Sequence, residues 1–249
     1  VHMNKKILIE ICVDNIESAL VSQRGGADRI ELCSSLSIGG VTPSKGMIEY
    51  AVSHLRIPVN VLIRPRGGDF LYTNSEFNVI KSDIFTAKVA GAAGIVIGML
   101  NSDGTVDSCR MKEVMEMCSP MTVTFHRAFD MVKEQFTALE QIIGLGCNRI
   151  LTSGGSLHAT NGSPIISELV QKSANRIIIM PGSGINERNF AELVEATGCR
   201  EYHLSASGLF QGKMRYENSQ LSDVFPSSYM QADLKKIEMI CSMAETLSE

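Results

Sequence analysis

Short apolar runs alternate with longer amphipathic segments along the chain of 249 residues. Apolar residues recur at steps of three and four in the longer segments, which predicts helices, whereas the short runs rich in β-branched residues predict strands. The expected strands are Ile7–Cys12, Arg29–Cys33, Val59–Arg64, Gly94–Gly98, Thr122–His126, Arg149–Thr152, Arg176–Met180 and Glu201–Ser205. The expected helices include Ile16–Arg24, Phe77–Val89, Val106–Cys118, Glu134–Ile143, Ile165–Ser173, Asn189–Thr197 and Ala232–Leu247.

This alternation of strands and helices predicts the fold class. Eight strand–helix units in a chain of this length favour an α/β protein that is a single (β/α)8 (TIM) barrel domain over residues 1–249. The alternative is a doubly wound open sheet, but the GxGxxG motif that usually follows its first strand is missing. The segment Phe210–Met230 is polar and lacks periodicity, so we expect a structureless lid or a disordered loop between the last strand and the last helix.

Composition excludes several classes of partner. The net charge of −4 provides no basic surface for nucleic acid, and no apolar run approaches the roughly 20 residues of a membrane-spanning helix. The charged residues Lys5 and Lys6 precede the first strand, where a signal peptide would be apolar. The 7 cysteines are widely spaced and odd in number, which argues against a disulfide framework and favours the cytoplasm. A homo-oligomer is compatible with the sequence.

Alternation within the expected strands places polar side chains inside the barrel. Successive residues of a strand face opposite sides of the sheet, and the apolar set must face the helices. The polar set on the lumen side comprises Glu10, Cys12, Arg29, Glu31, Cys33, Thr122, Thr124, His126, Glu201, His203 and Ser205. Buried charges require partners, so the lumen is either a binding site or an internal ion-pair network among Glu10, Glu31, Arg64 and His126.

The first two expected strands end in the same pattern, Glu10-Ile11-Cys12 and Glu31-Leu32-Cys33. Parallel neighbouring strands lie about 4.8 Å apart, so both thiols should project to the same side at close range. Two thiolates at that separation could bind one soft ion, Cu(I) above all. The alternative is that the two cysteines only fill space in the core.

Arginine and glycine motifs follow several of the strands. "IRPRGGDF" follows the third, "FHRAFD" the fifth, and "MPGSGIN" the seventh. Loops after strands 7 and 8 form the usual phosphate site of a barrel, although glycine also serves any tight turn. The candidate residues for binding a phosphate or a carboxylate are Arg64, Arg66, Asp69, Arg127, Thr152, Gly182, Ser183, Gly184, His203 and Ser205.

Several of these segments together resemble the copper homeostasis protein CutC family. The matching text is "EICVDNIESAL", "QRGGADRIELCSSLSIGGVTPS", "IPVNVLIRPRGGDFLY", "VTFHRAFDM", "RILTSGG" and "IIIMPGSGIN", which covers nearly the whole chain up to Ser205. The resemblance implies a cytoplasmic α/β barrel with a role in copper handling. It also implies that Cys12 and Cys33 match the cysteines proposed to bind copper in that family.

Three hypotheses about function follow. The first is a cytoplasmic Cu(I)-binding protein that uses Cys12 and Cys33, with Glu10, Glu31 and His126 nearby. The second is a barrel enzyme of unknown reaction that acts on a phosphorylated or carboxylated small molecule. In this enzyme Glu10 or Glu31 is the general base and His126 the proton donor, while the arginines hold the anion. The third is a scaffold with a vestigial site.

Overall fold

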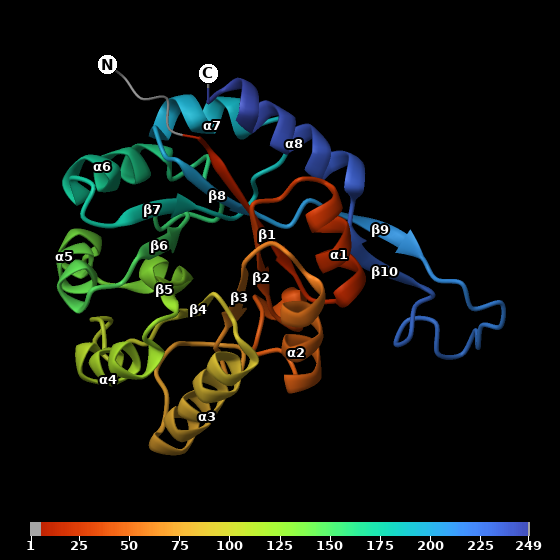
Figure 1. Cartoon of the computed structure of the whole chain (residues 1–249), viewed down its shortest axis with the longest axis horizontal. Helices are drawn as coiled ribbons and strands as arrows, with labels where there is room; N and C mark the ends of the chain where they lie inside the picture. Colours follow the sequence, from red (N-terminus) through yellow and green to blue (C-terminus); the bar gives the residue numbers. More distant parts are fainter. Residues whose placement is uncertain (1–5, 249) are drawn as a thin grey trace.

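Eight parallel strands form a ring at the centre of the protein (Figure 1). The structure is a computed structural model that describes residues 6–248, so residues 1–5 and 249 of the expected domain lie outside it. The strand order is β7-β6-β5-β4-β3-β2-β1-β8, and a parallel bridge between Gly182 and His203 joins β7 to β8. The strands are β1 (Leu8–Val13), β2 (Arg29–Leu32), β3 (Val59–Leu62), β4 (Gly94–Ile97), β5 (Thr122–Phe125), β6 (Arg149–Thr152), β7 (Ile178–Pro181) and β8 (Glu201–Leu204). The expected (β/α)8 barrel is confirmed.

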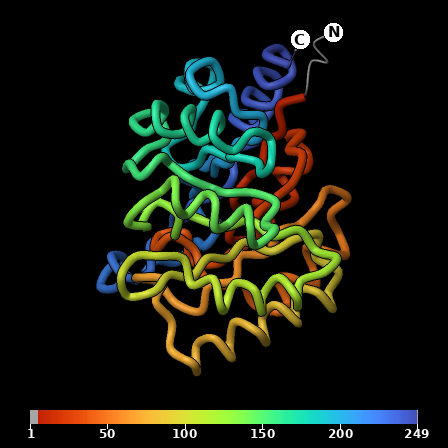
Figure 2. Tube along the Cα trace, turned by 90° about the vertical axis from the view of Figure 1, so that its left-hand side faces the viewer, coloured from red at the N-terminus to blue at the C-terminus, as the bar shows by residue number. Residues whose placement is uncertain are grey.

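Helices surround this ring on its outer side. Figure 2 shows α7 and α8 side by side at one end of the view and α3 at the other. The apolar face of the strands packs against the helices, as the alternation predicts, and Ile9, Ile11 and Ile30 are at most 1% exposed. The helices are α1 (Ile16–Arg24), α2 (Lys45–His54), α3 (Asn74–Ala90), α4 (Ser108–Cys118), α5 (Gln135–Leu145), α6 (Ser163–Ser173), α7 (Phe190–Thr197) and α8 (Leu234–Thr246), with short 3₁₀ turns η1 (Leu36–Ile38) and η2 (Arg127–Met131).

Element boundaries differ from the expected ones where local hydrogen bonds decide them. Helix α3 begins at Asn74 rather than Phe77 because Thr73 and Glu76 form a capping box. Strand β7 begins at Ile178 because Arg176 belongs to the turn after α6, where its N–H donates to the carbonyl of Ser173. Within residues 6–248, no helix combines the length and the apolar character needed to cross a membrane.

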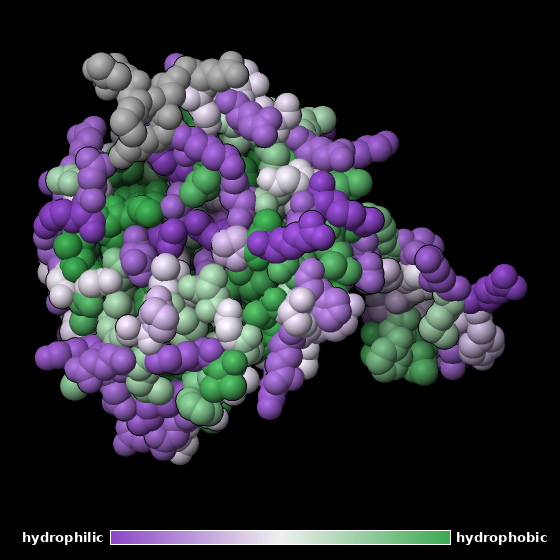
Figure 3. All heavy atoms as spheres, viewed as in Figure 1, coloured by the Kyte–Doolittle hydropathy of each residue, from purple (hydrophilic) through white to green (hydrophobic). Residues whose placement is uncertain are grey.

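The expectation of a structureless segment over 210–230 is wrong at both of its ends. The antiparallel strands β9 (Ser207–Gln211) and β10 (Ser228–Ala232) pair there, with Phe210 opposite Tyr229. The backbone hydrogen bonds of the ladder fix these residues even though the strands are short and largely exposed. The hairpin projects away from the barrel beyond α1 (Figure 1), and Figure 3 shows apolar side chains exposed on this arm.

Candidate functional site

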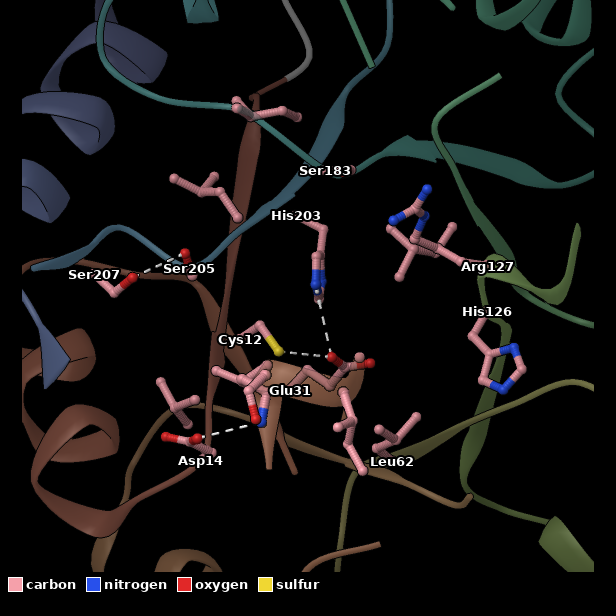
Figure 4. A pocket seen from close by; sticks show the side chains of 18 of the residues that line it. Cys12, Asp14, Glu31, Leu62, His126, Arg127, Ser183, His203, Ser205 and Ser207 are labelled. Atoms are coloured by element: carbon pink, nitrogen blue, oxygen red, sulfur yellow. Dashed lines mark hydrogen bonds and ion pairs between the residues drawn. The ribbon is translucent and has the colours of Figure 1, made fainter. Parts of the chain in front are cut away.

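A cavity of about 890 Å³ opens at the carboxyl ends of the barrel strands. Side chains that follow β1, β5, β7 and β8 converge on it, as barrel geometry requires. Figure 4 shows Cys12, Glu31 and His203 together on one side of the cavity and His126 on the other. The residues that the sequence predicts for the site and that line the cavity are Cys12, Glu31, Arg64, His126, Arg127, Ser183, Gly184, His203 and Ser205.

A network of ion pairs lies beneath this cavity, inside the ring of strands. The Glu10 carboxylate is paired with Arg29 and lies 2.8 Å from Nδ1 of His203. Arg29 also pairs with Glu201, and Nε of Arg149 donates to Glu201 over 2.6 Å. These side chains are almost fully buried, so each charge depends on its partner rather than on water.

Strand register explains why these groups meet. Glu10 is the register partner of Arg29 on β2 and of His203 on β8, and Cys12 is the partner of Glu31. Residues in register on neighbouring strands point to the same face, so the polar sets form layers inside the barrel. The polar lumen that the alternation predicts is therefore confirmed.

The membership of the network differs from the expected one. Arg64 and His126 take no part in it, and their places are filled by Arg29, Arg149, Glu201 and His203. The amide of Asn60 completes the set by donating to Glu10 over 3.0 Å. The signal that could have identified Arg29 and Glu201 is their position on the lumen side of the strand alternation. Asn60 carries the same sign, because it alternates with Val59 and Val61, whereas Arg149 shares its face with the apolar Leu151 and carries none.

Two thiols and a carboxylate form a cluster in the layer above. Sγ of Cys12 donates to Oε2 of Glu31 over 2.9 Å and lies 3.9 Å from Sγ of Cys33. Nε2 of His203 lies 3.6 Å from the same Glu31 oxygen. One ligand atom each from Cys12, Glu31 and His203 lie within 4.8 Å of one another, which is close enough for one metal ion. The hydrogen bond with Cys33, burial and the charge of Glu31 raise the pKa of Cys12 well above its usual value.

Two of the lumen carboxylates, Glu10 and Glu31, have pKa values shifted in opposite directions. Burial favours protonation of Glu10, but the charge of Arg29 and the hydrogen bond with His203 outweigh it and lower the pKa of Glu10. Burial raises the pKa of Glu31, and the charge of Glu10 adds to this effect while His203 opposes it. Burial also disfavours a charged His203, but Glu31 and Glu10 raise its pKa. Both shifts favour the protonated forms of Glu31 and His203.

Most of the predicted arginine and rim residues are engaged with other protein groups. Arg66 pairs with Asp69 over 3.0 Å and with Glu76 over 2.6 Å, so the expected pair of arginines does not converge on the cavity. Nε of Arg127 donates to Asp130 over 2.8 Å, and the hydroxyl of Thr152 donates to Asp130 over 2.5 Å. The guanidinium of Arg66 finds these acidic partners nearby because it lies beside the start of α3.

The glycine-rich loops after β7 and β8 form another part of the cavity wall. Gly184 has a φ of +73°, and a Cβ there would lie 2.5 Å from the ring of His158. A Cβ at Gly182 would lie 2.6 Å from Leu151, so packing around the loop after β7 already explains both glycines. The hydroxyls of Ser205 and Ser207 lie 3.3 Å apart at the cavity wall (Figure 4).

The fold and the site define a (β/α)8 barrel with a thiol–carboxylate–imidazole cluster inside its cavity. The CutC family model matches residues 7–208. This chain therefore belongs to the CutC family.

Relatives and solved structures agree with this assignment. The chain is 48% identical to the human copper homeostasis protein cutC homolog over 215 residues, which are 86% of this chain and 79% of the human one. It is 44% identical to a family protein CutC of Parabacteroides distasonis over 94% of this chain and 98% of that one. A CutC crystal structure from Streptococcus agalactiae superimposes with a TM-score of 0.77 at 32% identity, covering 80% of this chain and 98% of that one. The phosphoribosylanthranilate isomerase of Pyrococcus furiosus shares the fold alone. It superimposes with a TM-score of 0.58 at 14% identity, covering 96% of this chain and 99% of that one.

Proposed function

We propose that this chain is a cytoplasmic copper homeostasis protein that binds Cu(I) through Cys12 and Cys33. The observation that carries the proposal is the 3.9 Å separation of the two Sγ atoms beside the cavity. Thiolates are soft ligands that favour Cu(I) over harder cations. The name of the human relative associates that protein with copper homeostasis. All seven cysteines are free thiols, which suits a reducing compartment.

Two residues near Cys12, Glu31 and His203, also support this proposal. In the free protein the Cys12 thiol donates to Glu31, so the thiol proton already has an acceptor 2.9 Å away when an ion replaces it. His203 lies 3.6 Å from that carboxylate and can supply a nitrogen ligand or balance its charge.

Titration of the reduced protein with Cu(I), in competition with a colorimetric Cu(I) chelator, tests this function. We expect about one tightly bound Cu(I) per chain and its loss in Cys12→Ser or Cys33→Ser, because one thiolate alone makes a poor site. Cys118→Ser is the matched control, since Cys118 is also buried but lies on α4. The exposed Cys109 is replaced by serine in every variant to remove adventitious binding. Undiminished copper uptake by the Cys12→Ser/Cys33→Ser double variant would rule out the site.

The size of the cavity favours a second candidate function. A volume of about 890 Å³ is far larger than one metal ion needs and lies within the range of small-molecule pockets. We therefore also propose that the cavity takes a phosphorylated or carboxylated small molecule, as a barrel enzyme of unknown reaction would. Mass spectrometry of small molecules released from purified protein tests this proposal, and the absence of any retained anion would count against it.

A further inference from the structure

Two buried nitrogen atoms at the cavity wall have no hydrogen-bond partner within residues 6–248. They are Nε of Arg64 and Nε2 of His126. Both residues line the cavity, and their exposed fractions are 6% and 5%. A buried N–H group without an acceptor is unfavourable, and such groups in native proteins usually have a role. The copper proposal uses neither residue.

His126 is a hydrogen-bond donor at this position. The backbone N–H of Ala128 donates to Nδ1 of His126 over 3.1 Å, so Nδ1 is unprotonated and the proton of the neutral ring lies on Nε2. Burial and the positive charge of Arg64 lower the pKa of His126 to about 3. The imidazole is therefore neutral at physiological pH and offers its Nε2–H to an acceptor.

Arg64 adds a positive charge that no carboxylate neutralises among the ion pairs of the described chain. Its Nη1 donates to the carbonyls of Ile38 and Gly40 over 3.1 and 2.8 Å, and its Nη2 donates to Gly68 over 2.7 Å. These three bonds fix the guanidinium and use three of its five N–H groups, so Nε–H and one N–H of Nη2 remain for other acceptors. A buried cation held in this way attracts an anion.

The ring of Phe70 covers both donors. Its centroid lies 5.1 Å from Cζ of Arg64 and 4.9 Å from the ring centroid of His126, and Phe70 itself lines the cavity. The carbonyl of Phe70 accepts from the backbone N–H of Leu100 over 2.9 Å. The backbone is thus anchored, and rotation of the phenyl ring alone can open the two donors to a ligand.

We infer that Arg64 and His126 form a subsite for the carboxylate group of an organic acid. A carboxylate can accept from Arg64 with one oxygen and from Nε2–H of His126 with the other, and it brings a negative charge that balances Arg64. A phosphate dianion would bring two negative charges where Arg64 supplies one positive charge, beside an apolar phenyl ring. The inference rests on the second function proposed above. It is independent of copper, because His126 lies across the cavity from Cys12 (Figure 4).

NMR of protein with ¹⁵N-labelled histidine and backbone tests the subsite, with acetate as a small carboxylate probe. We expect the Nε2 signal of His126 to shift saturably with acetate, and to stay unchanged with acetamide and with inorganic phosphate at matched ionic strength. Arg64→Gln should weaken acetate binding by roughly tenfold or more, because it removes a charge-assisted bond. Phe70→Ala breaks no hydrogen bond and should tighten binding roughly threefold or more, because the donors then no longer need uncovering.

The remaining outcomes separate this inference from the two proposed functions. Equal shifts with acetamide or phosphate, or no shift of His126 in both the native protein and Phe70→Ala, would overturn the carboxylate subsite. Acetate shifts confined to the backbone amides of Ser205 and Ser207 would also overturn it, while leaving the cavity as an anion site. Cys12→Ser should keep the acetate response, and loss of that response would contradict the independence from copper.

Discussion

The two histidines that line the cavity have pKa values shifted in opposite directions, although burial lowers both. His203 lies among Glu10 and Glu31, and these carboxylates raise its pKa in spite of burial. His126 faces the cationic Arg64 instead, and burial lowers its pKa to about 3. The neighbours of each ring, rather than its depth, decide whether it serves as a cation or as a neutral donor.

The neutral state of His126 predicts a pH dependence of stability. Above about pH 6.5 the ring is neutral in both the folded and the unfolded chain. As the pH falls from 6.5 towards 3, the unfolded chain takes up the proton first, so the free energy of unfolding decreases. Between pH 7.5 and 4.5 we expect the native protein to lose on the order of 2 kcal/mol more than His126→Gln in urea unfolding. His54→Gln, at an exposed histidine, should behave like the native protein. Equal losses in all three proteins would show that His126 is not buried as a neutral ring.

Side-chain length decides how well the residues of the site could be predicted. Cys12, Glu31 and His203 lie on strands, and strand geometry alone fixes the face to which they point. Arg64 and Arg66 have long side chains that can turn from the cavity to loop carbonyls or to the start of a helix. Those partners come from distant parts of the chain, so no local pattern shows them.

At the scale of elements, the β9–β10 hairpin combines a base at the cavity with an arm away from it. Ser207, Gln231 and Ala232 at the base line the cavity, whereas Tyr216 and Phe225 in the loop over 212–227 are 75% and 72% exposed. Each strand has only 5 residues, too few for a period of two to stand out, which is why the sequence predicted only a loop. A lid function of the hairpin would therefore depend on its base, which lines the cavity, rather than on its arm.

Replacing residues 212–227 by an Asn-Gly turn tests that division. The new turn suits a two-residue hairpin and leaves both strands intact. We expect the free energy of unfolding to change by less than about 1 kcal/mol, because the removed residues are mostly exposed. Acetate affinity at the cavity should stay unchanged. Residues 212–227 are mostly exposed, so we expect their amides to be the fast-exchanging amides that the variant lacks in hydrogen-exchange maps. Weaker acetate binding with unchanged stability would instead assign the lid function to the arm.

At the scale of the whole molecule, ion pairs inside the ring connect strands that are far apart in the sequence. Glu10 on β1, Arg29 on β2, Arg149 on β6 and Glu201 on β8 meet there. The barrel itself could be predicted because strand–helix alternation persists along the chain. The partners within this network could not, since they depend on the register in which the ring closes.

Glu201 is the member of this network whose loss should affect the whole barrel most. It accepts from both Arg29 and Arg149, and its side chain is 6% exposed, so Glu201→Gln leaves two buried guanidinium groups short of a counter-charge. We expect the free energy of urea unfolding to fall by roughly 3–5 kcal/mol, the usual cost of breaking a buried ion pair. Glu140→Gln is the matched control, because it also removes a carboxylate that is bound by an arginine, Arg176. The side chain of Glu140 is 56% exposed, so water replaces the lost partner. Similar small losses in both variants would mean that water reaches the lumen and that the ring does not depend on its internal charges.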